Sequence, residues 1–315
     1  YARGMKVYVD ARPDASPTVP SWYSEMLPLS YDLARKIGKF NRRIVTQLEA
    51  GAAVDDVETW VNDEFFVDSN TASSIVSYID EQRRYVDAVP DDETLLVEKT
   101  VDDSGKLNLV FHTIYGRKVN DALCRIFADV LSRRVDANIG IVVDDHGFVL
   151  TMPRRPVDIE ELIRDVADLD LREVLQGAVR KTELMKRRFR HVAGRALMIL
   201  RNYKGNSKSV GKQQMKSHFL LSAVEDIDPE FPILKETYRE IMEDHMDIEH
   251  AAEVMAEIRA GDIEPEVIET DLPSPFAHNL VLQGQSDVVM MSDRKKRLQQ
   301  LHEQVMERIG EPVDA

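Results

Sequence analysis

The chain has 315 residues, a formal net charge of −15 and a single cysteine. This length accommodates one large or two ordinary domains, each with a real core. One thiol excludes an internal disulfide and a cysteine-based zinc site, and no apolar run approaches the ~20 residues that a membrane-spanning helix needs. No signal pattern opens the sequence, so we expect a soluble, cytoplasmic protein, and the mid-strand opening YARGMKVYVD indicates part of a longer polypeptide.

Helices and two hairpins are predicted for the first half. After an alternating strand (KVYVD) and a proline-marked loop, apolar spacing predicts helices near residues 29–50, 55–66 and 70–88. TLLVEKTV and KLNLVFHTI, joined by DDSG, predict one hairpin, and NIGIVVDDHGFVLTMP predicts a second. A helix from about 119 to 134 lies between them and carries Cys124 on its apolar stripe, as a buried structural thiol.

The second half is predicted to be mostly helical. Six segments after Pro156 carry apolar residues at three-and-four spacing, followed by one strand, EPEVIETDL, and a charged last helix. The fold class is therefore α+β, with β-hairpins or a mixed sheet in the N-terminal half, and a winged-helix-like arrangement of the later helices is left open. We divide the chain into a mixed part (1–155), a helical nucleic-acid-contacting part (156–285) and a charged helical tail (286–315).

Motifs for catalysis are absent from the sequence. The lysine-rich stretch RNYKGNSKSVGKQQMK (201–216) fails as a phosphate-binding P-loop, because Asn206 replaces the first glycine and Gln213 replaces the hydroxyl residue. His245 and His250, in HMDIEH, do not have zinc-ligand spacing, and we expect His245 and Asp247 to cap adjoining helix ends. We predict no catalytic residue, bound cofactor or metal in this segment.

The strongest functional signal is a local concentration of positive charge. Between Arg180 and Lys216 stand twelve lysines and arginines and one acidic residue, Glu183, in a chain that is otherwise acidic. Such a segment is typical of a grip on nucleic-acid phosphates, and the alternative is a solvated helix that pairs with the acidic remainder of the chain. The candidate phosphate contacts are Arg187, Arg188, Arg190, Arg195, Lys204, Lys208, Lys212 and Lys216.

Three further residues are weaker candidates. Trp22 follows a proline in a loop, where it either stacks on an unpaired base or anchors the loop by burial. Arg117 and Asn120 begin the helix after Gly116, where they either contact a phosphate or cap the helix. Trp60 lies at helical spacing with apolar neighbours and is expected in the core.

Several stretches together resemble one family. KVYVD, VFHTIYGRKVNDAL, VVDDHGFVLTMP, RFRHVAGRALMILR and above all MDIEHAAEVMAEIRAGDIEPEVIETDLPSPFAHNL resemble Lhr-type (large helicase-related) ATP-dependent DNA helicases of superfamily 2. Residues 1 to 285 are similar to the region that follows the motor and winged-helix domains. Pro20 and Trp22 match the family's P-F-W segment. Arg187, Arg188, Arg190 and Arg195 match a basic helix of the family, and the lysine loop matches a basic but variable insertion after it.

The resemblance implies an archaeal accessory region that supplies no ATPase motif. ATP and magnesium would bind the motor domains, and this region would hold single-stranded DNA during 3′-to-5′ translocation, with RNA or an RNA:DNA hybrid left open as the nucleic acid. The protein's own motor and winged-helix domains are the other expected partners. Two alternatives stay open: a glycosylase-like base-excision module used in DNA repair, and a scaffold that packs on the motors.

Overall fold

The computed structural model describes residues 27–200, 209–284 and 291–310, with the side chains of the last range described from 296. It also places two short antiparallel pairs, β1 (Ala2–Arg3) with β2 (Lys6–Val7) and β7 (Asn202–Tyr203) with β8 (Asn206–Ser207). No helix among the described residues is long and apolar enough to cross a membrane.

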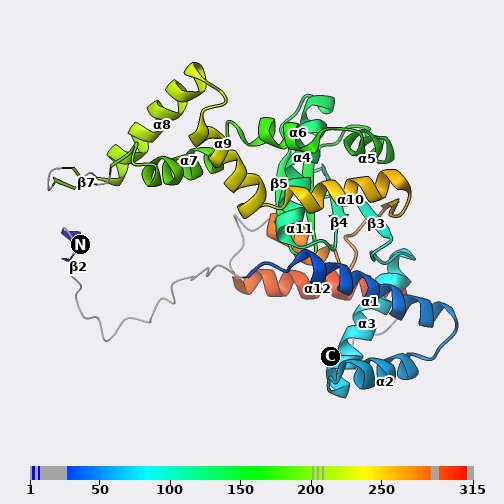
Figure 1. Cartoon of the computed structure of the whole chain (residues 1–315). Coiled ribbons are helices and arrows are strands. Elements are labelled where there is room, and N and C mark those ends of the chain that lie inside the picture. Colours follow the sequence, from blue (N-terminus) through cyan, green and yellow to red (C-terminus); the bar gives the residue numbers. More distant parts are fainter. Residues whose placement is uncertain are drawn as a thin grey trace.

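A five-stranded mixed sheet lies at the centre of the chain (Figure 1). Its order is β5 (Gly140–Asp144), β6 (Gly147–Pro153), β4 (Lys106–His112), β3 (Thr94–Val101) and β9 (Glu264–Glu269). Both predicted hairpins are confirmed, and the α+β fold class with them. The late strand β9 pairs in parallel with β3, so the mostly helical half contributes one strand to the sheet.

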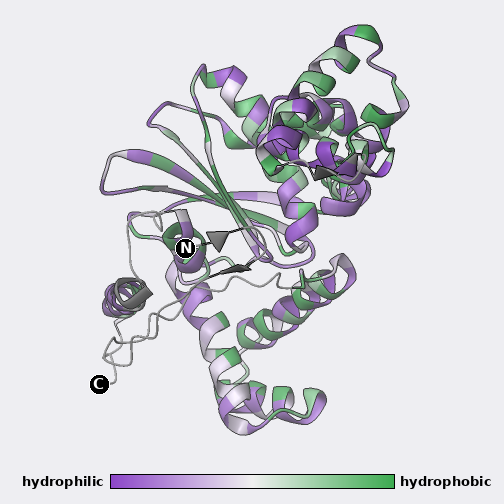
Figure 2. Cartoon of the chain, turned by 90° about the vertical axis from the view of Figure 1, so that its left-hand side faces the viewer, coloured by the Kyte–Doolittle hydropathy of each residue, from purple (hydrophilic) through white to green (hydrophobic). Residues whose placement is uncertain are grey.

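Alternating side chains give this sheet two buried faces. Leu109 and Phe111 point to the main core with helix α4 (Arg117–Val135), whereas Val110 and Val149 pack with Ala277 beside α11 (His278–Gly284). A strand that is covered on both sides needs apolar residues along its length, and Figure 2 shows the middle of the sheet coloured as hydrophobic. The sheet therefore forms a rigid base for the helices.

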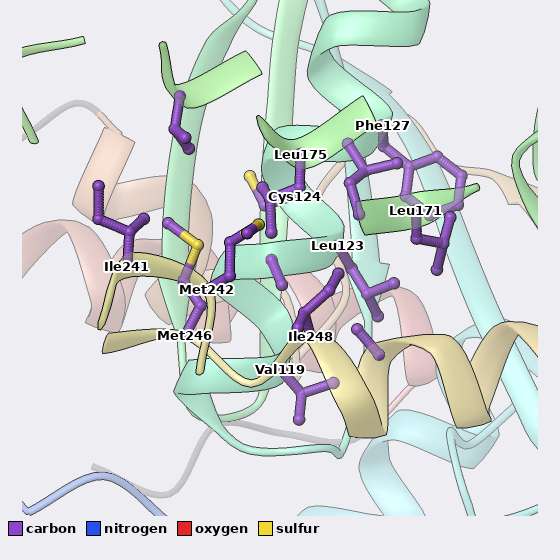
Figure 3. Close-up of a cluster of buried hydrophobic side chains, with 14 of the residues drawn as sticks. Val119, Leu123, Cys124, Phe127, Leu171, Leu175, Ile241, Met242, Met246 and Ile248 are labelled. Atoms are coloured by element: carbon purple, nitrogen blue, oxygen red, sulfur yellow. The ribbon is translucent and has the colours of Figure 1, made fainter. Parts of the chain in front are cut away.

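Helix α4 (Arg117–Val135) is the central helix of the main core. Figure 3 shows its inward side chains, among them Cys124, facing residues of α6 (Leu171–Val179), the π-helix η1 (Glu240–His245) and α10 (Ile248–Ala260). Cys124 is fully buried, and this burial raises the pKa of its thiol far above the ordinary range. The predicted buried thiol is confirmed.

The turn before α4 requires glycine. Gly116 has a φ of 82°, and a Cβ atom placed there would lie 2.3 Å from the carbonyl oxygen of Leu29. Any other residue would be strained by the left-handed backbone conformation, and its side chain would clash with the backbone of Leu29. The entry to α4 is thus fixed against the start of the first long helix.

The three N-terminal helices form a second, smaller core. These are α1 (Tyr31–Glu49), α2 (Val54–Phe65) and α3 (Ser69–Val86), close to the predicted ranges. Ile44, Val57 and Val76 are buried between them. Trp60 packs against Phe40 at a centroid distance of 6.3 Å, as expected for a core residue.

The later helices build on one side of the sheet and extend beyond it (Figure 1). Helices α5 (Ile159–Ala167) and α6 cover α4, and α7 (Glu183–Arg195), α8 (Val210–Ile227) and α9 (Pro232–Arg239) project away from the sheet. Helix α12 (Met291–Ile309), expected as a charged tail, packs against α3 and buries Leu301 and Val305. Asp247 caps α10, as predicted, by accepting a hydrogen bond from the backbone of His250.

One buried carboxylate joins the sheet to the segment that follows β9. Glu98, in the middle of β3, is fully buried and faces His112 Nε2 at 3.1 Å. It also accepts hydrogen bonds from the Thr270 hydroxyl (2.7 Å) and from the backbone N–H (2.8 Å) and hydroxyl (2.6 Å) of Ser274. Burial acts to raise the pKa of Glu98, but these hydrogen bonds outweigh it, so the pKa is lowered.

We expect Glu98→Gln to lower the free energy of unfolding by about 2–3 kcal/mol, because an amide cannot accept all of these hydrogen bonds. The lowered pKa stabilises the fold above the unfolded value near 4.5, and this contribution is lost as the pH falls through the folded pKa. Urea denaturation from pH 7 to pH 3 should therefore show a flatter acid limb for the variant. The exposed Glu269 of β9 supplies the control Glu269→Gln, and an unaltered acid limb in Glu98→Gln would contradict the assignment.

Candidate nucleic-acid interface

Helix α7 presents its basic side chains because its apolar side chains anchor it in the core. The hydroxyl of Thr182 caps the helix by accepting a hydrogen bond from the backbone N–H of Met185 at 3.3 Å. Met185, Phe189 and Val192 are buried in the main core. The arginines between these positions must therefore lie at the edges or on the outer face of the helix.

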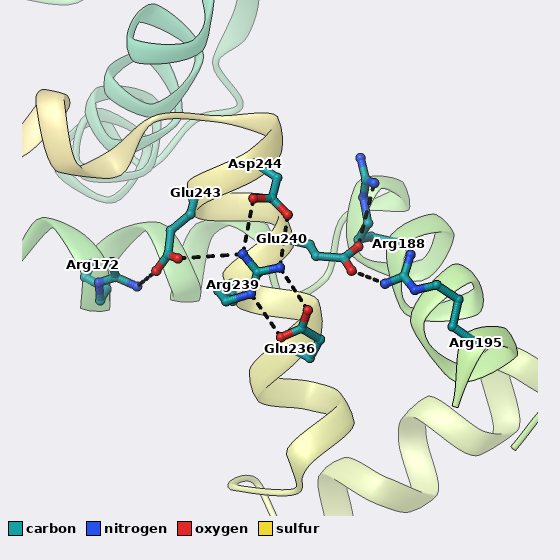
Figure 4. A network of polar contacts seen from close by, with 8 residues as sticks. All are labelled: Arg172, Arg188, Arg195, Glu236, Arg239, Glu240, Glu243 and Asp244. Carbon is teal, nitrogen blue, oxygen red and sulfur yellow. Dashed lines mark hydrogen bonds and ion pairs between the residues drawn. The ribbon is translucent and has the colours of Figure 1, made fainter. Parts of the chain in front are cut away.

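Two of the four predicted arginines of α7 form an internal ion-pair cluster (Figure 4). Arg188 lies 3.8 Å from a carboxylate oxygen of Glu240 in η1, and Arg195 donates a hydrogen bond to the other oxygen. Glu240 is only 6% exposed, so its charge depends on these partners. Arg188 and Arg195 thus follow the alternative to phosphate binding, in which basic side chains of the helix pair with acidic residues of the same chain.

The other carboxylates around η1 are also paired. Arg239 donates hydrogen bonds to Glu236 and Asp244, and Arg172 lies 2.9 Å from Glu243 (Figure 4). Arg187 and Arg190 form no ion pair with any carboxylate of the described residues; Arg187 is exposed and Arg190 is half-buried. Their positive charge remains available for an external anion.

Helix α8 adds a second basic surface next to α7. Lys212 and Lys216 are exposed, and the helical period places them on one face with Met215 and Phe219, which are 56% and 71% exposed. Ser217 and Leu221 are buried on the opposite side, against α7 and the core. We call Lys212, Met215, Lys216 and Phe219 the α8 outer face.

Sequence reasoning missed both Glu240 and Phe219. Phe219 stands in MKSHFLLSAV, one of the six segments for which apolar residues at three-and-four spacing predict a helix without showing which residues are exposed. The same spacing describes two faces of α8, of which one is buried and the other combines lysines with large apolar side chains. The spacing of Lys212, Lys216 and Phe219, which places them on one face of a helix, is the sequence signal that could have found this surface.

At the start of α4 the cap comes from Asp145, not from the side chain of Arg117 or Asn120. The carboxylate of Asp145 accepts hydrogen bonds there from the backbone N–H groups of Leu29 (3.0 Å) and Arg117 (3.2 Å). Asn120 is fully buried and donates to the carbonyl oxygens of Thr113 and Asp144. A phosphate would meet the Asp145 carboxylate at this helix end, although the Arg117 side chain itself is exposed.

Three predicted contacts, Trp22, Lys204 and Lys208, lie outside the described residues. Their roles stay predictions. Among the described residues, Arg188 and Arg195 pair with Glu240, Arg187 and Arg190 line the side of α7 toward α8, and Lys212 and Lys216 lie on the face of α8 that is turned away from α7.

Comparison with known proteins identifies the family. Residues 89–277 match the family described as DEAD/H associated. The chain belongs to this family. The matched range runs from the start of the sheet to the segment held by Glu98, so it includes the whole of α7 and α8.

Curated relatives confirm the resemblance to Lhr-type helicases. The chain is 43% identical over 311 residues to ATP-dependent helicase Lhr-Core protein 2 of Thermococcus barophilus and 41% identical over 311 residues to ATP-dependent helicase Lhr-Core of Saccharolobus solfataricus. These matches cover 98% and 97% of this chain and 35% of each relative. The chain therefore spans about a third of the length of these archaeal relatives.

A solved structure shares the fold. It is that of the Mycobacterium smegmatis helicase Lhr bound to ssDNA and AMP-PNP, with a TM-score of 0.69 and 24% sequence identity. The likeness covers 85% of this chain and 33% of that chain. The arrangement of sheet and helices in this family member is thus found in a solved Lhr helicase.

The two pairs of arginines on α7, one paired with Glu240 and one not, should differ in their contribution to the free energy of unfolding. Replacing Arg188 and Arg195 together with Gln leaves Glu240 buried without a charged partner and should lower the free energy of unfolding by about 1–2 kcal/mol. The matched double variant Arg187→Gln with Arg190→Gln should change it by less than about 0.5 kcal/mol, because neither arginine has a carboxylate partner in the part of the chain that the structure describes. Chemical denaturation of both variants at pH 7 checks this, and equal losses would refute the division.

Proposed function

We propose that this chain is the accessory region of an Lhr-type helicase that holds single-stranded nucleic acid on the surface formed by α7 and the α8 outer face. The observation that carries the proposal is the α8 outer face, where two exposed lysines flank an exposed phenylalanine. Lysines neutralise phosphates without reading sequence, and an exposed aromatic ring stacks on any unpaired base. The two together suit a single strand better than a duplex, whose bases are not free to stack.

Family membership and one shared fold support this proposal. The solved relative of this fold is described as bound to ssDNA. By the same analogy, translocation would run from 3′ to 5′, and ATP with magnesium would bind the motor domains of the whole helicase. This region would then keep the strand in place between steps of the motors, without itself contributing to ATP hydrolysis.

The lysine contribution predicts a change in salt dependence. Lys212→Glu with Lys216→Glu should weaken binding of a fluorescent single-stranded oligonucleotide for every sequence tested. The slope of log K against log salt should fall by about 1.4, since each phosphate contact on a single strand contributes ~0.7. Fluorescence anisotropy at several salt concentrations measures both quantities.

The control for this charge reversal lies on α1. Lys36 and Lys39 are exposed there, and Lys36→Glu with Lys39→Glu changes the net charge by the same amount away from α7 and α8. If both double variants lose affinity equally, the effect is one of overall charge, and the α8 outer face is rejected as the binding surface.

The aromatic contribution predicts a loss without a change in salt slope. Phe219→Ala should cost about 1–3 kcal/mol of binding free energy for single-stranded DNA, the range found for stacking of one base. Phe66, 93% exposed at the end of α2, offers the matched control Phe66→Ala. Anisotropy titrations of both variants with single-stranded DNA and RNA test the role of the ring, and equal affinities for the two variants would rule out stacking on Phe219.

A further inference from the structure

An open cavity of about 530 Å³ lies between α7 and α8, and α4 and η1 each contribute one residue, Arg125 and His245, to its wall. Four elements contribute titratable side chains to its wall, of which one is acidic, Glu183, and the others are Arg125, Lys186, Arg187, Arg190, His218 and His245. The cavity is distinct from the α8 outer face, because Ser217 and His218 point to the other side of α8 from Lys212 and Lys216. We call it the α7–α8 pocket.

Charge in the α7–α8 pocket is only partly compensated. Lys186 lies 2.5 Å from Glu183, and Arg125 lies 2.9 Å from Asp121. Arg187 and Arg190 have no such partner among the described residues, so two positive charges remain when the histidines are neutral. An anion with one or two negative charges complements this wall.

The pKa of His245, one of the two histidines in the pocket wall, is lowered by its surroundings. Burial lowers the pKa of His245, and the nearby Arg188, Arg125 and Arg187 lower it further, against the opposing effect of Asp121. His245 is therefore neutral at pH 7 and offers a hydrogen bond without adding charge. The pocket thus combines fixed cations with a neutral donor.

Ser217 provides an independent sign that a ligand belongs there. Its side chain lines the α7–α8 pocket and is 1% exposed, yet its hydroxyl has no hydrogen-bond partner among the described residues. Buried hydroxyls are normally paired, because an unmade hydrogen bond costs free energy. An acceptor oxygen of a ligand in the pocket would satisfy this donor.

We infer that the α7–α8 pocket is a seat for one phosphate group, held by Arg187, Arg190 and Ser217. Guanidinium groups donate paired hydrogen bonds to phosphate oxygens, and a serine hydroxyl donates one more. The inference rests on the proposed nucleic-acid function for the source of the phosphate, which is either an internal phosphodiester of the bound strand or the phosphomonoester at a strand end. A phosphate bound in this pocket would fix the position of the strand along the protein surface, whereas the contacts of the α8 outer face are the same for every nucleotide.

The first test uses inorganic phosphate and the 315-residue chain with labelled histidines. Phosphate, added against chloride at matched ionic strength, should shift the NMR signals of His218 and His245 saturably and leave that of His302 on α12 unmoved. Arg190→Gln should weaken this saturation at least tenfold, and the charge-neutral Ser217→Ala several-fold. Lys39→Gln on α1 is the control. Absence of saturation, or equal saturation in Arg190→Gln, overturns the inference.

The second test identifies the source of the phosphate. Single-stranded oligonucleotides with a 5′-phosphate, a 3′-phosphate or neither are titrated while the same histidine signals are followed. Shifts with all three support an internal phosphodiester, and shifts only with one phosphorylated end support a strand-end phosphate. Binding of all three without any shift of His218 or His245 overturns the seat and leaves the α8 outer face standing. A shift with inorganic phosphate, but no oligonucleotide binding, supports the seat and removes the proposed function.

Discussion

The buried carboxylate of Glu98 is the interaction on which the architecture depends. A charged group in the middle of a sheet is tolerated only when its oxygens are fully hydrogen-bonded, and its donors come from β4 and from the segment that follows β9. Those bonds hold residues 270–278 over one face of the sheet, where Ala277 and α11 cover Val110 and Val149. The opposite face is then free to carry α4 and the helices that position the basic surface.

A second buried carboxylate decides which arginines of α7 can act outside the protein. Glu240 sits in a π-helical turn, so its side chain points between Arg188 and Arg195 and draws both toward η1 (Figure 4). Arg187 and Arg190, one helical turn apart on the side toward α8, have no carboxylate partner within the described part of the chain. Paired and unpaired arginines therefore stand at adjacent positions of one helix, and the net charge of α7 overstates the number of cations that an external anion could reach.

Local patterns predicted most elements, and spatial pairing accounts for what they missed. The hairpins and α1 to α4 follow from alternation, helical spacing and turn residues that lie next to each other in the chain. The parallel pairing of β9 with β3 has no such signature, because nothing in either strand specifies a partner so far away in the sequence. The pairing of Glu240 with two arginines, and the exposed side of Phe219, likewise depend on how α7, α8 and η1 pack, which composition does not contain.

The distribution of charge gives the basic surface an effect beyond its contacts. The chain carries −15 overall, although residues 180–216 hold twelve basic residues against one acidic residue. On the proposed function, the acidic remainder would repel phosphates from most of the surface and the basic side chains of α7 and α8 would attract them, so the field would guide a strand to one part of the molecule. Such guidance is screened beyond ~8 Å at physiological salt, so it speeds encounter more than it adds to affinity. On the proposed function, retention of the strand would then come from short-range contacts, which are stacking on Phe219 and the hydrogen bonds of Arg187 and Arg190.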